Sequence, residues 1–321
     1  MTSSFDIIGD IHGQSDKLEA LLRNLGYRHR QGVWRHPTRQ ALFVGDFVDR
    51  GPGQIKVLEM VRQMTDAGTA QAVMGNHEFN AIAFFMEDPA SPGQHLRVRS
   101  AKNRHQHQRF LDEVGEDSQV HREWVDWFLG LPLWLETPEL RAVHACWHPA
   151  HMEFLRSSLA PGNRLSAELM EKASRRDSAE YVAVEALCKG LEVDLPAPVS
   201  YLDAEGTRRT RTRTRWWDDT ARDFRAAALL PPTQSHQLPV TPLPDECVLD
   251  YDNAKPVFFG HYWLTGTPGI QSNKICCVDY SAARDAHPLV AYRFDGEDEL
   301  DSDKLVAVSL SSDIQLWRPK I

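Results

Sequence analysis

Four short apolar runs in this chain end in the same way, at a glycine that is followed by side chains able to bind metal ions. The runs, each with the polar stretch after it, are FDII-GDIHG (5–13), ALFV-GDFVDRG (41–51), AVM-GNHE (72–78) and VFF-GH (257–261). Glycine lets the backbone leave a strand at angles that other residues resist, and it leaves room for a ligand to come close. The repetition therefore predicts buried strands that each deliver a metal-binding side chain.

The donor atoms in these stretches are carboxylate, imidazole and amide groups. Such a mixed set suits manganese, iron or zinc. Two ions about 3.5 to 4 Å apart need a shared carboxylate, and they can generate hydroxide at neutral pH because metal binding lowers the pKa of water to about 7. The sequence contains the parts for such a site.

These motifs, with a histidine that closes a further strand at His144, resemble the calcineurin-like metallophosphoesterases. The DRG and GNHE forms are typical of the branch that contains serine/threonine protein phosphatases, diadenosine tetraphosphate hydrolases and bacterial polynucleotide phosphatases. The resemblance covers residues 5–80, His144 and residues 256–294. It implies a layered α/β fold in which helices flank a central β-sandwich of mixed sheets, with the metal site at the C-terminal ends of the strands.

The resemblance also implies two divalent metal ions, manganese first, with iron or zinc as alternatives. The expected ligands are Asp10 and His12 for the first ion, Asp46 as the bridge, and Asn76, His144 and His261 for the second. A metal-bridging hydroxide would then attack phosphorus in line with the leaving oxygen. Trp263 stands where many relatives carry a second histidine, which leaves the first ion with fewer protein ligands, and water would fill the gap.

Three further residues are expected to act on the substrate. Arg50 would bind phosphate oxygens with its forked guanidinium. His77, paired with Asp49, would protonate the leaving group, an effect worth about 10² to 10⁴ in rate. Glu78, which opens a helix, is interpreted as structural.

The long middle of the chain lies outside the resemblance. We expect one metallophosphoesterase domain over residues 1–321, with an inserted cap at 150–245 that carries helices at 152–159, 166–172 and 179–187. Insertions between metal loops are where such enzymes build substrate caps.

Residues 208–217 (RRTRTRTRWW) alternate arginine and threonine before two tryptophans. This alternation with a period of two residues predicts a strand with the arginines on one face, which follows a turn at 203–206. One interpretation is a clamp for a polyphosphate or polynucleotide, with Arg215 and Trp217 facing the metals. The other is an exposed hairpin edge that Asp218 and Asp219 neutralise.

Histidines and basic residues elsewhere have plainer interpretations. His105 and His107 could form a metal site, but the polar tract at 94–108 favours a solvated helix face. Its arginines and Lys102 could border a phosphate pocket, although a solvated surface is the default. His148 and His151 are expected at a helix start or on the surface rather than as ligands.

Charge and composition exclude some classes of function. A net charge of −9 argues against general nucleic-acid binding or a membrane-surface coat. No stretch approaches the roughly 18 apolar residues of a membrane span. The five cysteines show no CxxC spacing, and the first residues do not resemble a cleaved signal, so we expect a reduced cytoplasmic protein.

The main functional prediction is a phosphatase that hydrolyses phosphate monoesters, on a phosphoprotein or a small molecule. The alternative is a diadenosine tetraphosphate (dinucleoside polyphosphate) hydrolase, favoured if the arginine-rich stretch lies over the metals. A distant alternative is a metal-containing binding protein without turnover, against which Asp49, Arg50 and His77 argue.

Overall fold

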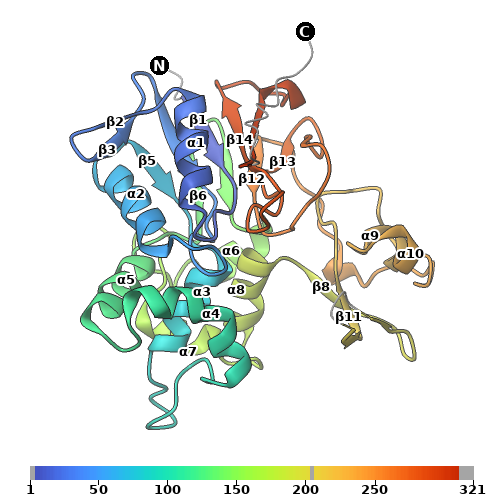
Figure 1. The fold of residues 1–321 in the computed structure, drawn as a ribbon. Helices are drawn as coiled ribbons and strands as arrows, with labels where there is room; N and C mark the ends of the chain where they lie inside the picture. The colour runs from blue at the N-terminus through green and yellow to red at the C-terminus, as the bar shows by residue number, and fades with distance from the viewer. Residues whose placement is uncertain (1–3, 203–205, 311–321) are drawn as a thin grey trace.

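Two mixed β-sheets pack face to face at the centre of the protein, in a computed structural model that describes residues 4–202 and 206–310 (Figure 1). The first sheet, in spatial order, is β15 (Leu305–Val308), β14 (Leu289–Phe294), β1 (Ser4–Ile8), β4 (Arg39–Phe43) and β5 (Ala70–Ala72). The second is β13 (Ile275–Cys277), β12 (Val257–Phe259), β7 (Arg141–Val143) and β6 (Trp134–Glu136). The expected layered α/β fold with mixed sheets is confirmed.

The alternation of side chains along the strands explains the layers. In and just after β4, Leu42 and Val44 belong to the apolar cluster between the two sheets, where Phe258 of β12 also lies. Ala41 and Phe43 point the other way, into the cluster formed with the helices. Both faces of the strand are buried, as the unbroken apolar run at 41–44 requires.

Five helices lie on one side of the central strands. They are α1 (Ser15–Leu25), α2 (Gln54–Asp66), α3 (Asn76–Phe85), α4 (Ala101–Val114) and α5 (Gln119–Leu129). Of these, α1 and α2 pack on the first sheet, α4 packs on α2, and α3 packs on α5. In α1 the leucines at helical spacing are buried, and Gly26 ends the helix in the left-handed region at φ 99°. A small hairpin of β2 (Arg28–Arg30) and β3 (Val33–Arg35) links α1 to β4.

Residues 150–245 divide into two parts of different character. The first contains α6 (Pro149–Leu155), α7 (Ala167–Ala173) and α8 (Ala179–Lys189), whose buried side chains join the main core. The second contains β8 (Glu192–Asp194), β9 (Tyr201–Leu202), β10 (Arg208–Arg209), β11 (Arg211–Arg213), α9 (Phe224–Ala227) and α10 (Pro232–Ser235), followed by the short 3₁₀ helix η1 (Asp245–Cys247). A second such helix, η2 (Ser302–Lys304), precedes β15.

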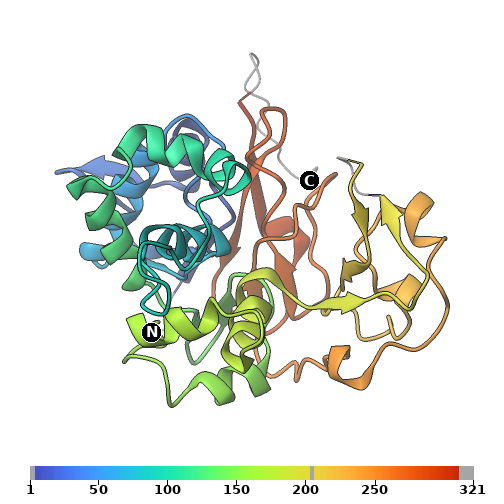
Figure 2. The same ribbon diagram turned by 90° about the horizontal axis from the view of Figure 1, so that it is seen from below.

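The second part of this insertion has a small apolar core of its own, which includes Val193, Phe224 and Leu238. Seen from below, it lies on the other side of the central strands from α1 to α5 (Figure 2). The helices expected at 152–159, 166–172 and 179–187 correspond to α6, α7 and α8 of the first part. The division into one catalytic domain with an inserted cap stays a prediction.

The strand expected over the arginine-rich stretch is broken in two. β10 pairs with β9, whereas β11 pairs with β8, so the chain changes partner at Thr210. Thr210 still accepts a backbone hydrogen bond from Leu195 at 2.7 Å. Of the turn expected at 203–206, residues 203–205 lie outside the described residues.

Two expectations about the surface and the cysteines can be compared with the structure. Within residues 4–202 and 206–310, no helix has the length and apolar character that a membrane crossing needs. All five cysteines are free thiols, and only Cys247 is partly exposed.

Candidate active site

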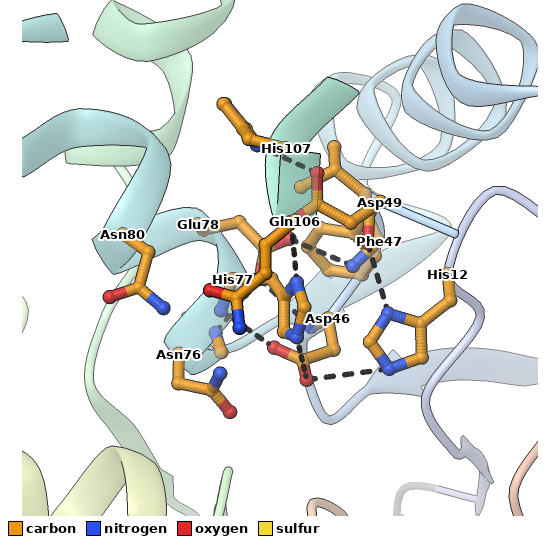
Figure 3. A network of polar contacts seen from close by, with 12 residues as sticks. His12, Asp46, Phe47, Asp49, Asn76, His77, Glu78, Asn80, Gln106 and His107 are labelled. Carbon is orange, nitrogen blue, oxygen red and sulfur yellow. Dashed lines mark hydrogen bonds and ion pairs between the residues drawn. The ribbon is translucent and has the colours of Figure 1, made fainter. Parts of the chain in front are cut away.

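The carboxyl ends of the strands bring the expected metal ligands together from distant parts of the chain, and Figure 3 shows three of them, His12, Asp46 and Asn76. His144 Nε2, after β7, lies 3.1 Å from Asn76 Oδ1 at the start of α3 and 3.4 Å from Asp46 Oδ1 after β4. His261 Nδ1, after β12, lies 2.7 Å from the same Asn76 oxygen. His12 Nε2 lies 3.6 Å from the other Asp46 oxygen, Oδ2. Asp46 therefore stands between His12 on one side and His144 on the other.

Asp10 completes this group. Its Oδ2 accepts the backbone N–H of His261 at 3.0 Å, which joins the end of β1 to the end of β12. Burial raises the pKa of Asp10, and the nearby carboxylates of Asp279 and Asp46 raise it further. The folded protein thus crowds three carboxyl groups together at this point.

Backbone carbonyls orient two of the histidines. His12 Nδ1 lies 3.0 Å from the carbonyl of Val48, and His144 Nδ1 lies 2.7 Å from that of Val44. A carbonyl can only accept, so each Nδ1 carries a proton, and in the neutral imidazole Nε2 then keeps a lone pair. This arrangement, in which one ring nitrogen is tied to a carbonyl, is typical of histidines that bind metal.

The site leaves buried polar atoms without hydrogen-bond partners in the described structure. They include Asp10 Oδ1, His12 Nε2 and His261 Nε2. Unpaired polar atoms in a protein interior are costly, and so are clustered carboxylates. Two groups of ligand atoms, His12/Asp46/His77 and Asp46/His144/His261, each lie within 4.8 Å of one another. The residues present fit divalent cations, and Asp46 belongs to both groups.

Glycines at the strand ends permit this close approach. Gly45 has φ +99°, and a Cβ there would lie 2.5 Å from the backbone nitrogen of Gly75 and 3.0 Å from His144 Nδ1. A Cβ on Gly260 would overlap with Asp10 Oδ1. The glycines are needed because the ligand loops pack against one another.

Several site residues have backbone conformations that side chains seldom adopt. His12, Asp46, Asp49, Arg50 and His261 have φ between 48° and 72°. Each such residue costs about 1 to 3 kcal/mol and persists only where the surroundings hold it. The strain is concentrated in the loops that carry the expected ligands.

Glu78 holds the loop of Asp46 in place. Its Oε2 accepts the backbone N–H groups of Asp46 at 2.8 Å and Gly75 at 3.0 Å, and its Oε1 accepts that of Phe47 at 2.8 Å. Burial raises the pKa of Glu78 to about 7, with Asp46 adding to the rise. The contacts agree with the structural role expected for this residue.

We expect Glu78→Gln to destabilise the protein by about 2 to 3 kcal/mol, because the amide NH₂ would face backbone donors and leave them buried without an acceptor. Urea unfolding followed by circular dichroism measures the change. Glu59→Gln, at an exposed position on α2, is the matched control and should stay close to wild type. Equal stability of the two variants would contradict the role of Glu78.

His77 lies between two carboxylates. Its Nδ1 is 2.5 Å from Asp49 Oδ2, and its Nε2 is 3.9 Å from Asp46 Oδ2 (Figure 3). Burial lowers the pKa of His77, but Asp46 and the hydrogen bond to Asp49 outweigh that effect and raise the pKa overall. The ring is therefore oriented by Asp49 and presents its other nitrogen to the group of expected ligands.

His107, interpreted from the sequence as part of a solvated helix face, is buried and contacts the site. Its Nδ1 lies 2.6 Å from Asp49 Oδ1, on the side opposite His77. Burial raises the pKa of Asp49, but His107 and His77 outweigh it and hold that pKa below its usual range. One signal was present in the sequence: His107 shares a helical stripe with Phe110 and Val114. His105 is exposed, as expected.

Trp263 packs against Arg50, and both residues line the cleft described below. The Arg50 guanidinium carbon lies 4.2 Å from the centroid of the Trp263 ring. Trp263 itself has φ 54°, and Asp279 Oδ2 accepts its backbone N–H at 2.6 Å. Asp279, whose role the motifs left open, thus holds the backbone turn after His261. The cation–π contact with Trp263 then fixes the position of the Arg50 guanidinium.

A cleft of about 970 Å³ is lined by six of the expected site residues, namely Asp46, Asp49, Arg50, Asn76, His77 and His261. Its basic lining residues are Arg50, Arg97, Lys102, Arg109, Lys189, Arg209 and Arg213. The polar tract at 94–108 therefore borders the cleft, which was the less favoured of its two interpretations. The concentration of positive charge contrasts with the net charge of −9 of the whole chain.

Arg215, expected to bind substrate, does not line this cleft. Its guanidinium donates to the carbonyl of Ala226, and it borders a separate small hollow with Trp216 and Leu243. Trp217 packs on Phe259 and Tyr262. The strand β11 ends at Arg213, and the arginines of this stretch that line the cleft are Arg209 and Arg213.

His148 and His151 lie at the start of a helix, α6, as expected. His148 Nδ1 accepts the backbone N–H of His151 at 3.3 Å and so caps α6. Neither residue belongs to the groups of potential metal ligands found among the described residues.

Residues 3–262 match the family model of the calcineurin-like phosphoesterases, so the chain belongs to this family of metal-dependent phosphoesterases. Members of the family bind two metal ions, in agreement with the two buried clusters that share Asp46.

Among curated proteins, the chain is similar to bis(5'-nucleosyl)-tetraphosphatases PrpE (asymmetrical). Identity to the protein of Oceanobacillus iheyensis is 33% over 141 residues, covering 44% of this chain and 54% of the relative. Identity to the protein of Halalkalibacterium halodurans is 47% over 74 residues, covering 23% and 30%. The chain thus spans about half, or less, of the length of these relatives.

Among solved structures, a protein serine/threonine phosphatase from Saccharomyces cerevisiae with similarity to human phosphatase PP5 matches with a TM-score of 0.50 and 16% identity. The match covers 98% of this chain and 82% of that chain. At this identity the likeness shows the fold alone.

Proposed function

We propose that this protein is a hydrolase of dinucleoside polyphosphates, the alternative raised from the sequence, rather than chiefly a phosphomonoesterase. The observation that carries the proposal is the basic lining of the cleft beyond Arg50. A phosphate monoester presents one phosphoryl group, which the metals and a single arginine can neutralise. Further cations along the cleft suit a longer phosphate chain. The similarity to bis(5'-nucleosyl)-tetraphosphatases supports the same substrate class.

Arg97 illustrates this excess of positive charge. Its guanidinium donates to the side-chain oxygens of Asn80 at 3.0 Å, Asn103 at 3.1 Å and Gln106 at 3.0 Å. Within the described residues, no carboxylate forms an ion pair with it at 4.0 Å or less. Burial lowers the pKa of Arg97. An arginine fixed by neutral amides, and facing a cleft, is ready to bind an anion.

The metal ions would be held by the residues expected from the sequence. Asp10 and His12 would bind one ion, Asn76, His144 and His261 the other, and Asp46 both. When bound, the ions supply Lewis acidity toward the phosphoryl oxygens and lower the pKa of water. Manganese, iron and zinc all suit this set of donors.

The remaining roles belong to side chains of the chain itself. Arg50, supported by Trp263, would bind and orient the phosphoryl group at the metals. His77 would hold a proton on Nε2 and donate it to the leaving oxygen, while Asp49 accepts from Nδ1 and keeps the ring in place. His107 would hold Asp49 from the other side.

Hydrolysis of diadenosine tetraphosphate beside para-nitrophenyl phosphate, both with manganese, tests the proposal. We expect a higher kcat/KM for the dinucleotide. Turnover of the simple ester alone would overturn the proposal and support a phosphomonoesterase that acts on phosphoproteins or phosphorylated metabolites. Absence of turnover in metal-loaded, folded protein would favour the binding-protein alternative.

We expect Arg97→Met to raise KM for diadenosine tetraphosphate about 10- to 100-fold, with a smaller change for para-nitrophenyl phosphate. The reason is that a hydrogen bond to a charged group contributes about 1.5 to 3 kcal/mol. Steady-state kinetics with both substrates measures the difference. Arg35→Met, at an exposed position on β3, is the control. Equal changes for both substrates would argue against a contact with the distal phosphates.

A further inference from the structure

A second hollow, of about 1060 Å³, opens beside the metal cleft. We call it the arginine groove. Arg209, Arg213 and Trp263 line both the arginine groove and the cleft, so the two spaces meet along these side chains. Arg208 and Arg211 line the groove but not the cleft.

Two kinds of side chain line the arginine groove. The first kind is the arginines of β10 and β11. The second is apolar and includes Leu229, Leu230, Pro231 and Leu264, which we call the apolar wall; Leu229 lies beside Arg213, to whose carbonyl its backbone N–H donates at 2.9 Å. Guanidinium groups bind phosphate oxygens in pairs, whereas a nucleobase needs a flat apolar or aromatic surface. A nucleotide carries both groups, and the volume is at the upper end for a small-ligand site.

Exposed carboxylates pair with two of these arginines, Arg211 and Arg213. Glu192 lines the groove, with an oxygen 3.6 Å from Arg211 Nη1 and another 3.8 Å from Arg213 Nε. Asp194 lies 3.0 Å from Arg211. These pairs are largely exposed to solvent, so each contributes about 0 to 1 kcal/mol. Arg208 donates to the neutral Ser200 hydroxyl at 3.0 Å. A phosphate chain can therefore compete for these guanidiniums.

We infer that the arginine groove binds the second nucleotide of the substrate, the one that the metal cleft does not hold. The arginines of β10 and β11 bind its phosphates, and the apolar wall binds its base. This inference rests on the proposed function, because it assigns a place to the other half of a dinucleotide. It also accounts for Arg209 and Arg213, which lie where a chain of phosphates passes from one space to the other.

Binding of ATP to metal-free protein, measured by isothermal titration calorimetry in the presence of EDTA, tests the groove apart from catalysis. We expect the double variant Arg208→Gln/Arg211→Gln to bind ATP at least about tenfold more weakly than wild type, since charge-assisted contacts to phosphate are lost. Arg222→Gln is the matched control, because Arg222 lies in the same insertion but lines neither space. It should bind ATP as wild type does.

Inorganic tripolyphosphate tests the apolar wall. ATP should bind more tightly than tripolyphosphate, and Leu230→Asp should weaken ATP binding more than tripolyphosphate binding. If wild type binds ATP and tripolyphosphate with equal affinity, the base does not bind to the apolar wall and this part of the inference is wrong. Circular dichroism spectra that match wild type show that each variant is folded.

The assignment of the arginine groove and the proposed function can be refuted independently of each other. If the protein cleaves diadenosine tetraphosphate and the double variant keeps wild-type KM and ATP affinity, the groove assignment is wrong although the function stands. If ATP binding depends on Arg208 and Arg211 but no dinucleotide is cleaved, the nucleotide site is supported and the function is wrong. Binding of a single-stranded oligonucleotide without binding of ATP would overturn the inference in favour of a polynucleotide.

Discussion

Replacement of Asp46 by Asn is expected to lower kcat for diadenosine tetraphosphate and for para-nitrophenyl phosphate by about 10³-fold or more. Asp46 is the one carboxylate common to both groups of potential metal ligands, with His12 near one oxygen and His144 near the other. An amide has one good acceptor oxygen and no charge, so it cannot serve both ions. The metals contribute several kcal/mol to transition-state stabilisation, and each 1.36 kcal/mol is a factor of ten in rate.

The measurement combines kinetics with the metal content of protein purified without chelator. The variant should retain less manganese, iron or zinc than wild type, while Asp126→Asn, at an exposed position on α5, should retain as much. Full activity of Asp46→Asn would refute the bridging role. A folded wild-type protein that takes up none of the three metals would refute the metal site itself.

His77→Ala is expected to lower kcat by about 10² to 10⁴, the usual contribution of a general acid. The loss should depend on the leaving group. Para-nitrophenolate leaves readily without a proton, whereas phenolate leaves poorly, so the loss should be larger for phenyl phosphate than for para-nitrophenyl phosphate. Steady-state kinetics of wild type and variant with the two esters provides the comparison.

Asp49→Asn is the companion variant. The amide of the variant can accept a hydrogen bond from only one of His77 and His107, so the ring of His77 loses its orientation. We expect kcat to fall, but by less than in His77→Ala. If His77→Ala reduces the rate equally for both esters, His77 acts by holding the metal loops or the substrate and not by donating a proton.

Much of the fold and of the candidate site was accessible from the sequence because each motif is local. A strand, its glycine and the polar residue after it occupy about ten consecutive residues, and the apolar runs predicted β1, β4 and β12 closely. The strands concerned lie in two sheets, β4 and β5 in the first and β7 and β12 in the second. Asp46, Asn76, His144 and His261 were expected as one group because the motifs resemble those of a known family, and the structure brings these residues within contact.

The extent of the substrate cleft was not accessible in the same way. The arginine-rich stretch favoured Arg215 by its alternation, but the chain exchanges one strand partner for another at Thr210 and leaves the strand after Arg213. Strand pairing with β8 and β9 depends on which segments lie beside it, and a regular local pattern contains no such information. The arginines of this stretch that reach the cleft are Arg209 and Arg213.

The sequence by itself therefore determined the family, the layered fold and the candidate metal ligands, because local backbone chemistry encodes each strand and its polar end. Only the tertiary structure decided that His107 contacts Asp49 across 58 residues, that Trp263 supports Arg50, and that Arg97 and Arg213 share one cleft. These contacts join segments far apart in the chain. They depend on how helices and loops pack over the sheets, which the periodicity of any one segment does not specify.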